Sequence, residues 1–151
     1  MHPFFTDYLE RLATLHLEIE KAIDGLSVDA LQWTPDPDVN SLMVLVVHLT
    51  GAERYWIGDV ALEQPSNRNR PSEFEAAGFN EEDLRARLQA SRDFAREGLE
   101  RLTLADLEQT RHAPLTNREV TVGWALLHAL EHTAIHAGHA QIMRQLWQQQ
   151  A

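Results

Sequence analysis

Apolar residues recur every three or four positions along four long stretches of the chain, which is the spacing of one face of an α-helix. The stretches cover about residues 4–23, 41–62, 81–102 and 121–148. The run MVLVVHLT in the second could also form a strand, but the apolar pattern continues through Trp56, longer than a typical strand. We therefore predict four long amphipathic helices and no sheet, which is an all-α four-helix bundle.

Turn and capping residues separate the four stretches. Asp24 and Gly25 end the first helix, Asn40 and Ser41 are both good N-caps for the second, and Asn80 caps the third. The remaining connections are expected to hold short helical turns at 27–33 and 103–109, loops at 34–40 and 64–79, and an irregular connection at 110–120. Because no linker or repeat divides the 151 residues, we expect one domain over residues 1–151.

Composition and charge narrow the possible functions. There is no cysteine, which excludes disulfides, zinc–thiolate sites and thiol nucleophiles. The formal charge of −10 is spread over the chain, which disfavours nucleic acid and anionic membrane surfaces, because both need clustered Lys and Arg. No stretch resembles a signal peptide or a membrane span, so we expect a cytoplasmic protein with a small-molecule substrate.

Histidines gather in the fourth predicted helix. At about 100° per residue, four of the eight histidines fall within an arc of about 80°: His128, His132, His136 and His139. Ile135, Met143 and Leu146 lie close to the same arc, which predicts that it faces inward. Imidazoles on a buried face must be hydrogen-bonded, charged or bound to a metal.

His48 interrupts the apolar run of the second predicted helix and is the natural partner for His132 and His136. The latter two are four residues apart, so both rings project from adjacent turns of one helix face. With His48 they would offer three nitrogens to one ion and leave its other positions to water or substrate. The spacing alone is a weak signal, since an inward histidine is commonly a hydrogen-bonded core residue. An all-nitrogen set suits zinc, nickel, copper or iron rather than calcium or magnesium.

Other catalytic patterns do not fit the residues around these histidines. A zincin needs Glu directly after the first histidine, but Thr133 occupies that position. A di-iron carboxylate bundle needs Glu three residues before each ligating histidine, where this chain has Ala129 and Thr133. No nucleophile-elbow motif is present. Glu53 lies about 140° round its helix from His48, so we expect it to pair with an arginine rather than ligate an ion.

Two segments in combination resemble the DinB/YfiT superfamily: SLMVLVVHLTGAERYW in the second helix and HALEHTAIHAGHAQIMRQL in the fourth. LQWTPDPDVNS also resembles the loop that leads into that family's second helix. The resemblance is nearest to the branch that includes mycothiol-dependent maleylpyruvate isomerase-like proteins, and residues 64–79 contribute least to it. That branch often has Glu at the position of His132, which argues against carrying the isomerase activity over to this chain.

The resemblance implies an up-down-down-up four-helix bundle that is often a homodimer. It also implies a divalent ion held by three histidines, which correspond here to His48, His132 and His136. His128 and His139 share the histidine arc, and from that position we expect them to flank the site. Zinc or nickel is expected first, and iron or copper are alternatives. In relatives with assigned activities, the metal activates a low-molecular-weight thiol such as mycothiol or bacillithiol, and the proteins are transferases, isomerases or hydrolases.

Two kinds of function remain open. As an enzyme, the protein would use the ion to activate a thiol toward a small electrophile, or a water in a hydrolase. As a non-catalytic metal-binding or stress-response scaffold, it would use the ion to hold the second and fourth helices together. An open coordination position favours the enzyme, whereas a fourth protein ligand such as His139 favours the structural role.

Overall fold

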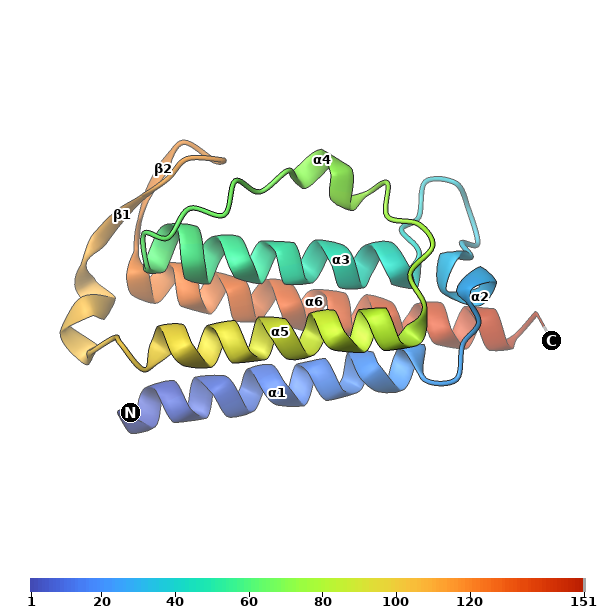
Figure 1. Cartoon of the computed structure of the whole chain (residues 1–151), viewed down its shortest axis with the longest axis horizontal. Coiled ribbons are helices and arrows are strands. Elements are labelled where there is room, and N and C mark those ends of the chain that lie inside the picture. Colours follow the sequence, from blue (N-terminus) through green and yellow to red (C-terminus); the bar gives the residue numbers. More distant parts are fainter. Residues whose placement is uncertain (151) are drawn as a thin grey trace.

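Four long helices lie side by side in the computed structural model, which describes residues 1–150 (Figure 1). They are α1 (Pro3–Ile23), α3 (Leu42–Glu53), α5 (Glu81–Leu99) and α6 (Val122–Gln148), and α3 continues into the π-helical segment η1 (Arg54–Ala61). In Figure 1, α1 and α6 run in one direction while α3 and α5 run in the other. All four predicted helical stretches are confirmed, including the one that could have been a strand.

Short helical elements lie in the connections between the long helices. They are α2 (Val28–Gln32), α4 (Arg70–Glu73) and the 3-10 helix η2 (Leu104–Glu108). The segment that carries α4 passes over α3 (Figure 1), so a stretch predicted as plain loop lies against the helix that bears His48. No helix within residues 1–150 is both long and apolar enough to cross a membrane.

Side-chain caps fix the starts of the helices. The Ser41 hydroxyl accepts the Val44 amide at 3.2 Å. Asn80 and Asp83 form a capping box, in which each side chain accepts the other's backbone N–H, at 2.9 and 3.0 Å. Caps of this kind stabilise a helix by about 1 kcal/mol. Of the two N-caps expected for the second helix, Ser41 is the one used and Asn40 is not, and the Asn80 cap of the third is confirmed.

A β-hairpin replaces the irregular connection predicted at 110–120. Strand β1 (Thr110–Ala113) pairs antiparallel with β2 (Arg118–Thr121), and Ala113 lies opposite Arg118. Asn117 supplies a left-handed turn residue with φ 50°, which Asn tolerates well. The prediction of no sheet is therefore wrong. Strands of four residues are too short to show a clear alternation, and the hairpin is held by burying Ala113 and Val120 in the core.

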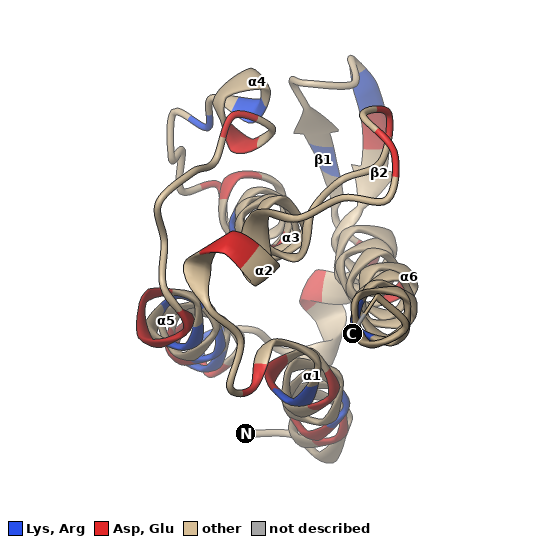
Figure 2. Ribbon diagram, turned by 90° about the vertical axis from the view of Figure 1, so that its right-hand side faces the viewer, with Lys and Arg blue, Asp and Glu red and all other residues tan. Residues whose placement is uncertain are grey.

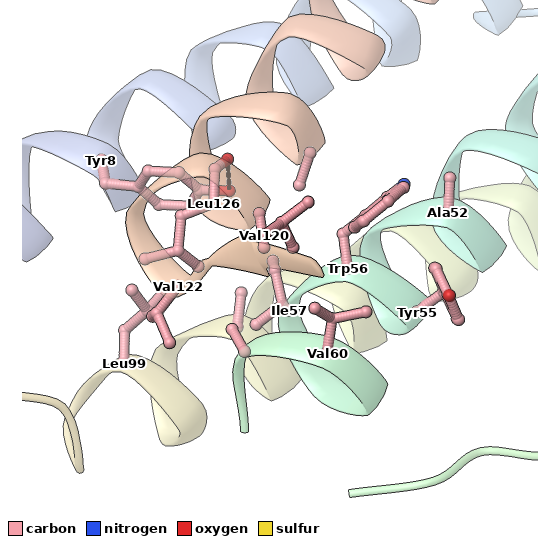
Figure 3. Packing of buried hydrophobic residues seen from close by; sticks show 14 of the residues in the cluster. Tyr8, Ala52, Tyr55, Trp56, Ile57, Val60, Leu99, Val120, Val122 and Leu126 are labelled. Carbon is pink, nitrogen blue, oxygen red and sulfur yellow. Dashed lines mark hydrogen bonds between the residues drawn. The ribbon is translucent and has the colours of Figure 1, made fainter. Parts of the chain in front are cut away.

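The hydrophobic core consists of two clusters along the bundle. One contains Tyr8, Trp56 and Leu126, and Figure 3 shows part of it, where the Tyr8 hydroxyl donates to the Leu126 carbonyl at 3.0 Å. The other contains Ile19, Leu49, Leu88 and their neighbours.

A buried polar layer lies between these two clusters, with one residue from each long helix. The Glu53 carboxylate pairs with His16 at 2.8 Å, accepts the Thr133 hydroxyl at 2.6 Å and accepts the Ser91 hydroxyl. The prediction that Glu53 pairs with an arginine is therefore wrong, because within residues 1–150 its partners are His16, Ser91 and Thr133. Glu53 faces the bundle centre, whereas the neighbouring Arg54 pairs with Asp59. Because a buried carboxylate needs all these donors, the layer fixes how the four helices align along their axes.

Charged residues are distributed unevenly among the four long helices. Figure 2 shows Lys, Arg, Asp and Glu concentrated on α1 and α5, whereas α3 and α6 are largely uncharged. On α6 the buried face centres on Ala129, Thr133, Ala137 and Ala140. The histidine arc lies to one side of that face, and Ile135 at its edge is 52% exposed, so the prediction that Ile135 faces inward is wrong. The histidines therefore lie where the core meets the surface.

Candidate metal centre

Three histidines that are far apart in the sequence meet between α3 and α6. Nε2 of His132 lies 3.2 Å from Nε2 of His48 and 3.2 Å from Nε2 of His136. One ligand nitrogen from each ring lies within 4.8 Å of the others. Two nitrogens bound to one tetrahedral ion at about 2.0–2.1 Å are themselves about 3.3 Å apart. The triad predicted from sequence is thus brought together at a separation that suits a shared ion.

Protons alone do not satisfy these ring contacts. Nδ1–H of His48 donates to Oε2 of Glu73 at 2.9 Å, so Nε2 of a neutral His48 ring carries a lone pair. Nε2 of His132 carries either one proton or one lone pair, and this single group faces both of the other rings. At most one of its two 3.2 Å contacts can then be a well-formed hydrogen bond. A cation between the three nitrogens would satisfy all of them at once.

The electrostatic surroundings keep two of the rings neutral. Burial, followed by the neighbouring imidazoles, lowers the pKa of His132 to about 3 and that of His136 to about 4. Neutral rings have free lone pairs, which is the form that binds a metal. Nδ1 of His132 is buried and has no hydrogen-bond partner within residues 1–150, so packing holds this ring in place.

These lowered pKa values predict that the metal-free protein loses stability in acid. Below about pH 6.5, the ordinary pKa of His, the unfolded chain takes up protons at His132 and His136 that the folded chain does not. Stability should therefore fall from pH 6.5 toward pH 4, on the order of 1–2 kcal/mol by pH 5 after allowing for partial exposure. Urea denaturation at pH 7.5 and pH 5, with chelator present, measures this.

The matched variants for this pH test are His132→Asn with His136→Asn, against His112→Asn. His112 is exposed and bonds Glu119 in the hairpin, so its variant should keep the full pH dependence. The double variant should lose most of it. Equal pH dependence in the double variant and the parent would show that the two rings are not held neutral.

A carboxylate and an arginine support His48 from behind. Glu73, at the end of α4, is buried and accepts Nδ1–H of His48, while Arg68 donates to both of its oxygens at 2.6 and 2.8 Å. Burial raises the pKa of the Glu73 carboxyl, but the hydrogen bonds from His48 and Arg68 outweigh it and the pKa is lowered overall. Such a carboxylate fixes the tautomer and orientation of a metal-binding imidazole.

Gly51 makes room for this support. A Cβ at Gly51 would lie 2.2 Å from Oε1 of Glu73 and 3.4 Å from Nε of Arg68. Glycine inside a helix costs about 1 kcal/mol relative to alanine, so its use here has a structural reason. Sequence reasoning missed Glu73 and Arg68, and a glycine in the last turn of α3 is the one local signal that another segment approaches the helix there.

Aromatic residues lie on one side of the triad. An apolar cavity lies on the other side, beyond His139. His128 stacks on Trp124 with 4.7 Å between ring centroids, and Phe74 packs on His48 at 4.8 Å. Nδ1 of His139 lies 3.3 Å from Nδ1 of His136. Beyond His139 lies a cavity of about 380 Å³ with mainly apolar walls, including Val39, Leu45, Ile142, Met143 and Leu146. The two flanking histidines expected from sequence thus lie beside the triad, and His139 also borders the apolar cavity.

Comparisons with known proteins place the chain in a family and identify a solved structure with a similar fold. The family model for mycothiol-S-transferase matches residues 7–149. Among solved structures, a conserved protein from Enterococcus faecalis matches with a TM-score of 0.78 and 18% identity, covering 93% of this chain and 95% of that one. At this identity the structural likeness shows the fold alone. No curated protein matches the chain.

Proposed function

Because the chain belongs to the mycothiol-S-transferase family, which is DinB/YfiT-like, we propose that it is a metal-dependent enzyme that transfers a low-molecular-weight thiol to a small electrophile. The observation that carries the proposal is the convergence of three imidazole nitrogens that protons alone cannot satisfy. The family match supports a thiol as cosubstrate, and the apolar cavity bordered by His139 offers room for a substrate.

His48, His132 and His136 would hold one divalent ion. Zinc or nickel suits three imidazoles, and iron or copper is chemically compatible. Such an ion, when bound, lowers the pKa of a coordinated thiol and so favours the nucleophilic thiolate at neutral pH. The donor set fits this role, because three neutral ligands leave the charge of the ion uncompensated.

The other residues of the site would position the reactants. Glu73 and Arg68 hold the His48 ring in one orientation. His128, which stacks on Trp124 and meets Trp56 edge-on, would limit access from one side, and His139 would border the apolar cavity on the other.

A non-catalytic metal-binding scaffold is the second candidate. One observation favours it: the three ligands come from α3 and α6, so an ion would hold these helices together. A fourth bond from His139 would close the site, but its Nδ1 faces the His136 ring rather than the shared centre of the three Nε2 atoms. A hydrolase is the third reading and differs from the transferase only in the nucleophile.

Several features expected from sequence stay predictions. They are the single domain, the up-down-down-up topology of the DinB type, the cytoplasmic location and the homodimer. The helix directions in Figure 1 support the topology. Exposed apolar residues along α6 support a homodimer: Leu127, Ile135 and Ile142 are 59%, 52% and 54% exposed.

Metal loading combined with thiol transfer tests the proposed function. The chelator-treated chain is loaded with zinc or nickel and assayed with mycothiol, bacillithiol or no thiol against a chromogenic aryl halide. We expect thiol-dependent loss of the halide with loaded protein only. Loss without thiol would identify a hydrolase, and stoichiometric metal with no turnover of any electrophile would favour the scaffold.

A further inference from the structure

A second and larger cavity lies on a different face of α3 from the imidazoles. It has a volume of about 660 Å³ and is enclosed by α3, α5 and the segment 66–79. None of the three clustered histidines lines it. Its lining combines charged and hydroxyl or amide side chains with apolar residues that include Phe79 and Phe94. We call it the arginine cavity, after Arg54, Arg68 and Arg87.

Three guanidinium groups converge on this cavity. Arg54 lies 4.2 Å over the Phe94 ring, and Arg87 lies 5.3 Å over the Phe79 ring. Arg68 is the most buried of the three, with 9% of its side chain exposed. Guanidinium groups that rest on aromatic faces are held in fixed orientations, which prepares them to bind an anion.

The carboxylates around the arginine cavity do not exhaust these donors. Arg54 pairs with Asp59 through Nη1, and Arg68 pairs with Glu73 through Nε and Nη2. Within residues 1–150, Arg87 has no carboxylate partner, and Nη1 of Arg68 has no hydrogen-bond acceptor. Among the residues that line the cavity, three are arginines and one, Glu73, carries a carboxylate, so the lining has a net positive charge in a chain whose formal charge is −10.

The local backbone is built to point these groups inward. Arg54 begins the π-helical turn η1, and such turns occur frequently at functional sites. Asn67, on the opposite wall, has φ 56°, a left-handed conformation that turns the chain back over the cavity.

We propose that the arginine cavity binds a small molecule with a carboxylate or phosphate group, and that its occupancy is transmitted to His48 through Arg68 and Glu73. Glu73 forms part of the cavity wall with one side and accepts Nδ1–H of His48 with the other. An anion bound at Nη1 of Arg68 competes with Glu73 for the same guanidinium. As its hydrogen bonds from Arg68 weaken, the Glu73 carboxylate accepts more strongly from Nδ1–H of His48, and the hydrogen bond on that ring changes. This site is separate from the proposed thiol-transfer site and does not require a bound metal.

Calorimetric titration of the full, chelator-treated chain tests the proposal. The probes are succinate and inorganic phosphate, which distinguish a carboxylate ligand from a phosphate ligand. We expect saturable one-to-one binding of at least one probe, with a dissociation constant below about 1 mM. Arg87→Ala should weaken this binding about tenfold, as expected for one lost charge-assisted hydrogen bond. Ala90→Trp, which fills the cavity without changing its charge, should abolish it.

Arg96→Ala is the matched control, because Arg96 is exposed on the same helix and does not line the cavity. Equal weakening by Arg87→Ala and Arg96→Ala, or no saturable binding of either probe, would overturn the site. The coupling is measured separately, as the ¹⁵N shifts of the His48 ring during titration. Shifts that follow saturation support it, and an unchanged His48 ring at saturation would overturn it.

Discussion

His48→Ala, His132→Ala and His136→Ala should each lose bound metal on dialysis, with affinity reduced by more than about 100-fold. Removing a supporting group outside the ligand set costs about 10- to 100-fold in metal affinity, and loss of a ligand must cost more. Each variant removes one of the three ligand nitrogens and leaves two imidazoles at the site. Metal content after dialysis, measured by mass spectrometry, gives the result directly.

Controls separate the triad from other histidines. His112→Ala should keep its metal, because His112 lies in the hairpin and bonds Glu119. His139→Ala should retain the ion while changing access to the apolar cavity. If all three triad variants keep stoichiometric metal, the ligand assignment is wrong. If the parent chain binds no metal under any loading condition, the three are core histidines and the proposed enzyme function fails with them.

The long-range order of the bundle could be predicted because it rests on periodic burial. A face that is apolar every three or four residues must be covered, and four such faces on one chain of this length cover one another. His48 stood out for the same reason, since a polar ring inside an apolar run needs a partner. The four-residue spacing of His132 and His136 places two rings on one face, but it indicated a metal site only together with His48 and the neighbouring histidines.

The features that sequence reasoning missed depend on contacts without a local pattern. Glu73 reaches His48 across 25 residues, from a polar segment in which no periodicity marks one carboxylate among its neighbours. The hairpin depends on burying Ala113 and Val120 against the bundle rather than on strand propensity. Ile135 lies at the edge of the histidine arc of α6 and is exposed. Periodicity predicts that such an arc is buried, but only the packing of the neighbouring helices decides which of its edges faces water.

Glu53 shows the same limit in the core. Its position on the helix correctly placed it away from His48, but the identity of its partner depends on α1, α5 and α6 together. Periodicity gives the face on which a residue lies, whereas hydrogen-bond partners are set by the alignment of whole helices. Buried polar partners are therefore the part of a bundle that is hardest to read from sequence.

Removing the support behind His48 should weaken metal binding although no ligand is changed. Glu73→Ala should reduce affinity about 10- to 100-fold, because the His48 ring loses the acceptor that fixes its tautomer. It also leaves Arg68 buried without its carboxylate. Glu73→Gln should cost less, since an amide oxygen can still accept Nδ1–H, though without the charge. Competition against a chelator of known affinity measures each step, and equal affinities in all three proteins would show that Glu73 does not act on the ion.

Gly51→Ala tests the same support without touching either charged residue. Alanine in a helix interior is ordinarily more stable than glycine by about 1 kcal/mol. At Gly51 the new Cβ would meet Glu73 at 2.2 Å, so we expect the carboxylate to be displaced and metal affinity to fall as in Glu73→Ala. Gly138→Ala is the matched control, because Gly138 lies on α6 with nothing within 4 Å of its added Cβ. That variant should gain helix stability and keep its metal affinity. A Gly51→Ala protein that behaves in the same way would show that Glu73 can move without consequence for the site.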